Sequence, residues 1–375
     1  MIETKEIKKS ANSNDDIISS QLFRYDHEEV LFCQDNATGL KAIIAIHNTV
    51  LGPSLGGCRI WKYNNDQEAI TDALRLSRGM TYKASVAGLN LGGGKSVIIG
   101  DAKTIKSEAL MRRFGRFVND LGGKYITAED VGSSMRDMEY IRMETKHVTG
   151  IPESMGGSGD PSPVTAYGVL LGMKAAAHQQ WGSDNLKGKK VSVQGIGNVG
   201  EHLVKHLTDE GAKVYITDIN QDKLKEVAAK YKAEVVALDA IYDVDVDIYA
   251  PCALGATVNT DTLKRLKCSI IAGSANNQLA DEKVQGEELA KNGIIYAPDF
   301  VINSGGLINV YAELGGSYNK ARAMQHADKI YDITKSILAL AKTENIPTYL
   351  AANKTAEKRI EAMGKVKMNY TSNRK

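Results

Sequence analysis

The chain has 375 residues, of which 43% are hydrophobic and 25% are charged, and its formal net charge at pH 7 is +2. This length suits two globular domains, and the near balance of charge gives no indication of a nucleic-acid or membrane-surface partner. No apolar run reaches the roughly 18 residues of a membrane-spanning helix. Residues 1–20 are too polar for a secretory signal, and we expect them to form a frayed extension.

The cysteines and histidines indicate neither disulfides nor a metal. The four cysteines are far apart in the sequence and form no CxxC pair, which favours reduced thiols and a cytoplasmic location. His202 and His206 share a helix face, but the glutamate of an HExxH site and a third ligand are missing. We therefore predict a solvent-facing histidine pair and no metal. The cysteines are Cys33, Cys58, Cys252 and Cys268.

The first part of the chain mixes strand and helix patterns. β-Branched and alternating apolar runs predict strands, and apolar positions at helical spacing predict helices. The predicted strands are 40–49, 58–63, 95–101 and 124–132, and the predicted helices are 66–85 and 107–121.

A long apolar helix is predicted over 160–181, with Ser162 as its N-cap and Pro163 at its first position. After it, short buried runs alternate with helical segments, which is typical of a parallel sheet with crossover helices. The predicted fold is α/β, with an N-terminal substrate and oligomerisation domain (1–149) and a Rossmann domain (150–345) separated by a cleft. We expect the C-terminal helix, within 346–375, to pack back on the first domain. The later strands are predicted at 190–194, 213–217, 234–238, 246–250, 268–273 and 293–297, and the later helices at 305–314, 319–342 and 355–367.

A glycine motif in its expected context predicts the dinucleotide site. Gly195, Gly197 and Gly200 follow one strand and open a helix, and the next strand ends at Asp218. Such glycines allow a tight turn, close approach to the pyrophosphate and close helix packing. An aspartate at that place binds the ribose hydroxyls and repels a 2′-phosphate, which favours NAD. The intervening residues Ile196, Asn198 and Val199 are assigned to the same cofactor loop.

A second glycine run, "GLNLGGGKS" at 88–96, is similar to a phosphate-binding loop with the wrong spacing. Its context also differs, because a strand follows the glycines where a phosphate loop continues into a helix. We interpret the glycines as a loop that crowds a ligand and presents Lys95. Lys83, Lys95 and Asp130 lie at element ends and could converge on one cleft.

With these motifs in place, the chain resembles the glutamate/leucine/phenylalanine/valine dehydrogenases over residues 22–365. The resemblance implies a two-domain homo-oligomeric enzyme, an octamer assembled through its N-terminal domain. Its implied reaction is the reversible conversion of an L-amino acid to a 2-oxo acid and ammonia with NAD. The matching segments include "LGPSLGG", "GLNLGGGKSVIIGD", "YITAEDVG", "PSPVTAYGV", "GIGNVG", "APCALG", "IAGSANNQL" and "YAPDFVINSGGLINV".

The resemblance also implies roles for individual residues. Lys83 would pair with the substrate carboxylate, Lys95 would activate water in its uncharged form, and Asp130 would exchange a proton with the amine. A nearby cationic Lys83 and partial burial would favour that uncharged form of Lys95. The remaining implied substrate contacts are Asn277, Asn303, Leu55, Gly56, Ala128, Leu307 and Val310, and the remaining NAD contacts are Ser162, Thr165, Cys252, Ala253 and Asn276.

The side-chain pocket implied by the family, made by Leu55, Ala128, Leu307 and Val310, is apolar throughout. An apolar wall cannot offset the desolvation of a second carboxylate, so we expect leucine, valine and isoleucine and not glutamate as substrates. A valine or phenylalanine dehydrogenase remains an alternative, as do a catalytically inactive NAD-binding regulatory protein and a phosphotransferase that uses Lys95.

Overall fold

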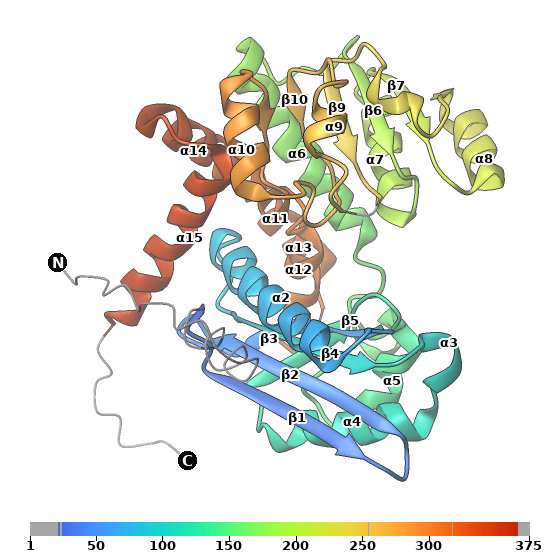
Figure 1. The fold of residues 1–375 in the computed structure, drawn as a ribbon, viewed down its shortest axis with the longest axis vertical. Helices are drawn as coiled ribbons and strands as arrows, with labels where there is room; N and C mark the ends of the chain where they lie inside the picture. The colour runs from blue at the N-terminus through green and yellow to red at the C-terminus, as the bar shows by residue number, and fades with distance from the viewer. Residues whose placement is uncertain (1–21, 23–24, 254, 317, 367–375) are drawn as a thin grey trace, which may run out of the picture.

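The computed structural model describes residues 22, 25–253, 255–316 and 318–366. Its two sheets lie one above the other, with the blue-to-teal part of the chain around the lower sheet and the green-to-orange part around the upper one (Figure 1). The expected N-terminal extension lies outside the described residues, as does the end of the helix expected at 355–367.

The lower sheet has five strands in the order β1-β2-β4-β3-β5. β1 and β4 both pair antiparallel with β2, whereas β3 lies parallel to both β4 and β5. The strands are β1 (Glu29–Asp35), β2 (Leu40–Asn48), β3 (Ser54–Trp61), β4 (Gly92–Ile99) and β5 (Tyr125–Glu129).

Helices cover both faces of this sheet because alternate residues of each buried strand point to opposite sides. On β2, Ile43 and Ala45 pack with Ile70 and Leu74 of α2 (Asp66–Val86), whereas Ile44 belongs to the core on the other face. The helices of that other face are α4 (Glu108–Asp120) and α5 (Met135–Arg142), preceded by the short α3 (Ala102–Ile105).

The upper sheet has six parallel strands in the order β11-β10-β9-β6-β7-β8. The chain starts in the middle at β6, moves out to β8, and returns to the other side through β9, which is the doubly wound order of dinucleotide-binding folds. The predicted α/β fold with a Rossmann sheet is therefore confirmed. The strands are β6 (Lys190–Gln194), β7 (Lys213–Thr217), β8 (Glu234–Val235), β9 (Ile248–Pro251), β10 (Ile270–Ile271) and β11 (Ile295–Tyr296).

The helices around the upper sheet begin with the long α6, whose alanine- and glycine-rich faces are buried on nearly all sides. They are α6 (Ser162–Trp181), α7 (Asn198–Asp209), α8 (Gln221–Tyr231), α9 (Thr260–Leu263), α10 (Glu282–Lys291), α11 (Asp299–Ile302), α12 (Gly305–Tyr311), α13 (Lys320–Ala327), α14 (Lys329–Glu344) and α15 (Thr348–Gly364). Two 3₁₀ turns, η2 (Glu153–Met155) and η3 (Ala240–Tyr242), complete the set.

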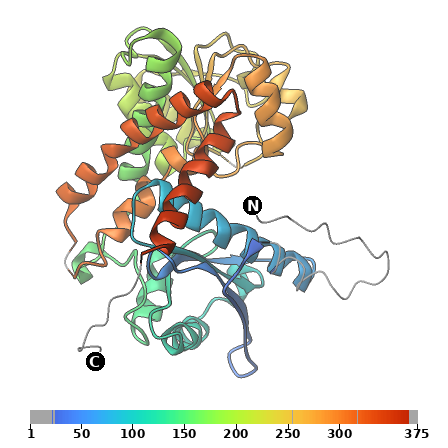
Figure 2. The ribbon, with the colours of Figure 1, turned by 90° about the vertical axis from the view of Figure 1, so that its left-hand side faces the viewer.

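The C-terminal helix α15 descends from the upper half and lies against α2 of the lower half (Figure 2). Tyr82 donates a hydrogen bond to Glu357 (2.7 Å), and Ser85 donates one to the carbonyl of Ala356 (2.8 Å). Arg359 donates to the carbonyl of Leu89 (2.7 Å). α15 thus ties the upper half of the molecule to the helix that carries Lys83. The boundary at 149/150 stays a prediction.

Several local expectations differ from the structure. Ser162 is the first helical residue of α6, and Pro161 takes the N-cap position expected for Ser162. The helix expected over 319–342 is divided at Asp328 into α13 and α14, and the last helix begins at Thr348 and not at 355. His202 and His206 are half-buried, with the His206 ring 6.2 Å from the Tyr167 ring, so the pair is not simply solvent-facing.

Candidate active site

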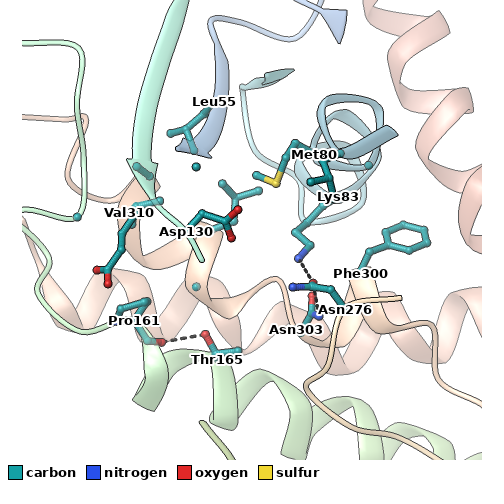
Figure 3. A pocket seen from close by; sticks show the side chains of 18 of the residues that line it. Leu55, Met80, Lys83, Asp130, Pro161, Thr165, Asn276, Phe300, Asn303 and Val310 are labelled. Carbon is teal, nitrogen blue, oxygen red and sulfur yellow. Dashed lines mark hydrogen bonds between the residues drawn. The ribbon is translucent and has the colours of Figure 1, made fainter. Parts of the chain in front are cut away.

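A cleft of about 360 Å³ lies between the two halves of the molecule. It receives side chains from β3, β4, β5 and α2 below and from α6, α12 and the loop after β10 above. Lys83 and Asp130 are directed into it from α2 and from the end of β5 (Figure 3). The predicted site residues that line it are Leu55, Lys83, Lys95, Ala128, Asp130, Thr165, Val199, Asn276, Asn277, Asn303, Leu307 and Val310.

The glycine run places Lys95 in this cleft in a way that differs from the expectation. Gly92, Gly93 and Gly94 belong to β4 itself and not to a loop. A Cβ on Gly93 would come within 2.1 Å of the backbone nitrogen of Thr81 in α2. The missing Cβ therefore lets α2 lie directly on β4, and the glycines crowd neighbouring protein, not a ligand. Since Lys95 is two residues further on the same face, this close packing sets Lys83 beside it.

Lys95 and Asp130 form an ion pair inside the cleft. The Lys95 side chain is 7% exposed, and its Nζ lies 2.5 Å from Asp130 Oδ2. Arg59 donates to the same oxygen through Nε (3.1 Å). Burial raises the pKa of Asp130, but Lys95 and Arg59 outweigh this effect and hold the pKa below its usual range. A Cβ on Gly57 would lie 2.7 Å from the Asp130 Cβ, so the glycine makes room for this carboxylate.

Lys83 is the second lysine of the cleft, and its pKa is shifted. Burial lowers the pKa of Lys83 to about 8, although the carboxylate of Asp299 opposes the shift, and Lys95 adds to it. Lys83 donates to Asn276 Oδ1 (3.1 Å), and Asn303 donates to the same oxygen (2.9 Å). The Oδ1 atom of Asn303 is buried without a hydrogen-bond partner among the described residues. It is therefore an acceptor ready for a donor in the cleft.

One wall of the cleft is apolar. Leu55, Leu307 and Val310 belong to one buried cluster that also contains Ile126 and Val164, and Ala128 is buried beside them. Gly56 does not line the cleft, because alternate residues of β3 face opposite sides of the sheet and Leu55, Gly57 and Arg59 occupy the side of the cleft. Its neighbour Gly57 lines the cleft instead.

The glycine loop between β6 and α7 has the geometry of a pyrophosphate cradle. Gly195 has φ +97°, and a Cβ there would strike Ala253 at 2.7 Å. A Cβ on Gly200 would lie 2.1 Å from the Gly195 carbonyl. By contrast, a Cβ on Gly197, the N-cap of α7, would meet no atom within 4 Å among the described residues. Open space in front of a helix N-terminus fits a phosphate group.

Asp218 lies beside this cradle and accepts a hydrogen bond from the Ile196 backbone N–H (2.7 Å). The residues thus fit a dinucleotide, whose phosphates the N-terminus of α7 would hold. Cys252 follows β9 and has its Cβ 3.6 Å from the position of a Cβ on Gly200. Asn198 opens α7, whereas Ser162 is buried at the start of α6 and does not line the cleft.

Arg59, Met80, Asp299 and Phe300 are among the cleft residues that were not predicted from the sequence. Arg59 continues the β3 face that carries Leu55 and Gly57, so strand alternation could have revealed it. Met80 is one helical turn before Lys83, and Asp299 and Phe300 fall in the "YAPDFVINSGG" segment already noted. Burial raises the pKa of Asp299, while backbone N–H groups such as that of Gln278 oppose the shift.

Across the residues that the structure describes, no group of three potential metal-ligating side chains comes together. Within the same part of the chain, no helix is long and apolar enough to cross a membrane.

The doubly wound sheet, the phosphate cradle and the lysine–carboxylate cleft together define a two-domain dehydrogenase with a dinucleotide-binding domain. The family models agree: "Glu/Leu/Phe/Val dehydrogenase, dimerisation domain" matches residues 27–147, and "Glutamate/Leucine/Phenylalanine/Valine dehydrogenase" matches 156–220 and 215–367. The chain belongs to the glutamate/leucine/phenylalanine/valine dehydrogenase family.

Individual relatives are similar along most of the chain. Leucine dehydrogenase of Geobacillus stearothermophilus is 56% identical over 93% of this chain and 95% of its own. Leucine dehydrogenase of Thermoactinomyces intermedius is 55% identical over 92% of this chain and 94% of its own. The crystal structure of L-tryptophan dehydrogenase from Nostoc punctiforme matches with a TM-score of 0.81 and 45% identity, covering 92% of this chain and 99% of that one.

Proposed function

We propose that the protein catalyses the NAD-dependent, reversible oxidative deamination of branched-chain L-amino acids, with L-leucine, L-valine and L-isoleucine as substrates. The observation that carries the proposal is the convergence of Lys83, Lys95 and Asp130 on one cleft with an apolar wall. That cleft opens towards the phosphate cradle through Val199, which both share.

The substrate is held at two points. The Lys83 ammonium pairs with the α-carboxylate, replacing its bond to Asn276 by a charge-assisted hydrogen bond. The free Oδ1 of Asn303 accepts a hydrogen bond from the substrate amine, and Asn277 positions the substrate beside the nicotinamide. Bound NAD supplies the acceptor for the hydride that leaves the substrate Cα. Fixing the carboxylate and the amine orients Cα–H for that transfer.

Lys95 and Asp130 handle the protons of the hydrolytic half of the reaction. Lys95 in its uncharged form removes a proton from water as the water oxygen attacks the imine carbon. The resulting ammonium stabilises the carbinolamine oxygen. Asp130 exchanges a proton with the substrate amine as ammonia departs. The 2.5 Å contact between the two groups supports a direct sharing of these protons.

The apolar wall supports a branched aliphatic substrate. Glutamate would bring a second carboxylate against Leu55, Ala128, Leu307 and Val310, and its desolvation would be uncompensated there. The names of the two leucine dehydrogenase relatives support leucine, whereas the L-tryptophan dehydrogenase with the similar fold shows how widely the family's side-chain preference varies. Valine or phenylalanine dehydrogenase is therefore the alternative.

Cofactor choice, assembly and location are part of the proposal. Asp218, directly after β7, supports NAD over NADP because its carboxylate would repel a 2′-phosphate. Ser162, Thr165, Cys252, Ala253 and Asn276 complete the proposed cofactor contacts. The dimerisation-domain match supports a homo-oligomer, which we propose to be an octamer. The free thiols of all four cysteines support a cytoplasmic location.

The test is NADH formation, followed by near-ultraviolet absorbance, with purified protein, NAD and one L-amino acid at alkaline pH. We expect turnover with leucine, valine and isoleucine and none with glutamate. A preference for phenylalanine would support the alternative within the family. Tight NAD binding without turnover on any of these amino acids would overturn the proposal in favour of a regulatory NAD-binding protein.

A further inference from the structure

Arg59 lies in a charged network that joins the active site to helix α2. Its Nε donates to Asp130 Oδ2 (3.1 Å), and its Nη1 donates to Asp72 Oδ2 (2.8 Å). The Tyr63 hydroxyl donates to the same Asp72 oxygen (2.8 Å). Arg75 pairs with the other oxygen of Asp72 (3.3 Å). Both ends of the Arg59 guanidinium are therefore fixed.

The ion pair between Lys95 and Asp130 poses a chemical problem for the proposed reaction. A buried carboxylate 2.5 Å from an ammonium stabilises the charged lysine, yet water activation needs the uncharged amine. Lys83 is a second cation in the cleft, but it donates its hydrogen bond to Asn276 and not to Asp130. Something must weaken the hold of Asp130 on the Lys95 proton.

We infer that Arg59 is a positioning residue that shares Asp130 Oδ2 with Lys95 and so allows Lys95 to release its proton. The inference rests on the proposed function and deepens it. Two cations bonded to one carboxylate oxygen compete for the same negative charge, and Arg59 cannot lose its proton near neutral pH. When Lys95 becomes neutral, Arg59 remains as the charge partner of Asp130, so the carboxylate is not left buried and unpaired.

Asp72 fixes the orientation of the Arg59 guanidinium. It anchors Nη1, so the planar guanidinium presents Nε to Asp130. Besides Tyr63, which bonds Asp72, the other titratable groups that face the Lys95–Asp130 pair are Cys58 on β3, Lys83 on α2, and Tyr125 and Glu129 on β5. Burial raises the pKa of Cys58, Tyr125 and Glu129. None of the four contacts Asp130 Oδ2 in the hydrogen bonds recorded for the described residues, so Arg59 is the group in place to compete with Lys95 there.

The experiment compares pH–rate profiles of kcat/KM for L-leucine in Arg59→Gln, Arg59→Lys and Arg75→Gln. Arg75→Gln is the matched control, because it removes the same charge from the same Asp72 but leaves Asp130 untouched. The free amino acid titrates identically in every assay, so a difference between variants reports the enzyme. Thermal melting and NAD binding are measured on each variant.

We expect the acid limb of the profile to move to higher pH by about one unit in Arg59→Gln, a tenfold loss below the limb that recovers above it. Arg59→Lys keeps the charge and should move the limb less, and Arg75→Gln should not move it. An unmoved limb in Arg59→Gln, an equal shift in Arg75→Gln, or no rescue by lysine would overturn the inference. If Arg59→Gln does not fold, Arg59→Met, which also removes the charge, is measured in its place, and an unmoved limb in the folded Arg59→Met protein overturns the inference.

The failure of this inference is distinguishable from the failure of the proposed function. If the wild-type protein turns over L-leucine but the acid limb is unmoved in the Arg59 variants, only the role of Arg59 is rejected. A wild-type protein without turnover would reject the function itself.

Discussion

The close packing of α2 on β4 predicts the effect of one added methyl group. A Cβ in Gly93→Ala would lie 2.1 Å from the Thr81 nitrogen and 2.2 Å from its Oγ1, whereas ordinary Cβ contacts begin at 3.4 Å. Helix α2 and strand β4 must therefore move apart by about 1.3 Å. Lys83 follows Thr81 by two residues on α2, so the displacement moves it away from Lys95 and from the substrate carboxylate.

The expected result is a large loss of activity with a moderate loss of stability. Overpacking of this kind costs about 1–3 kcal/mol of unfolding free energy. A misplacement of roughly 1 Å in a positioning group costs about 100-fold in kcat/KM. The assay is NADH formation with L-leucine, with urea unfolding and calorimetric NAD titration on the same sample. NAD affinity should be unchanged because the cradle at Gly197 lies in the other half of the molecule.

The matched control is Gly315→Ala, since a Cβ at Gly315 would meet no atom within 4 Å among the residues described. It should keep full activity. A folded Gly93→Ala protein with wild-type kcat/KM would refute the reasoning, because it would mean that the lysines do not depend on this contact.

Three further perturbations test separate parts of the site. Asp218→Ala removes the carboxylate near the cradle. The ratio of kcat/KM for NADP to kcat/KM for NAD should therefore rise about tenfold, which corresponds to about 1.4 kcal/mol. An unchanged ratio would contradict the NAD assignment. Because the pKa of Lys83 is about 8, its ammonium is lost above that pH. The inhibition constant of 4-methylpentanoate, which has no amine, should therefore rise about tenfold per unit above pH 8, and a flat profile would exclude Lys83 as the carboxylate partner. Leu307→Ala enlarges the space beside the apolar wall. The ratio of kcat/KM for phenylalanine to kcat/KM for leucine, measured by NADH formation, should rise by a factor that corresponds to about 1–3 kcal/mol. An unchanged ratio would place Leu307 outside the substrate pocket.

The hydrophobic periodicity of the sequence predicted the architecture well, because the order of strand and helix patterns along the chain also determines how the strands are connected in the sheet. The alternation of short buried runs after residue 190 predicted the parallel sheet, and the glycines at 195, 197 and 200 predicted the β6–α7 turn. Strand ends were less predictable: β8, β10 and β11 have only two residues each, since pairing with a neighbour and not hydrophobicity decides where a ladder stops.

The glycine run before Lys95 shows what a single sequence does not contain. Three glycines favour a loop by local propensity, but here they form a strand because α2 and Tyr125 press on the two faces of β4. Strand alternation could have placed Arg59 in the cleft, but its ion pairs with Asp72 and Asp130 form only in the folded protein and could not be read from the sequence.

The most direct test of the proposed chemistry is the rate of NAD reduction by Lys95→Ala with L-leucine, measured beside its NAD affinity. General acid–base groups contribute about 10²- to 10⁴-fold, so turnover should fall by at least about 100-fold while NAD binds as tightly as before. Retained turnover would contradict a proton-transferring amine at this position, and a loss of NAD binding would mean that Lys95 holds a phosphate.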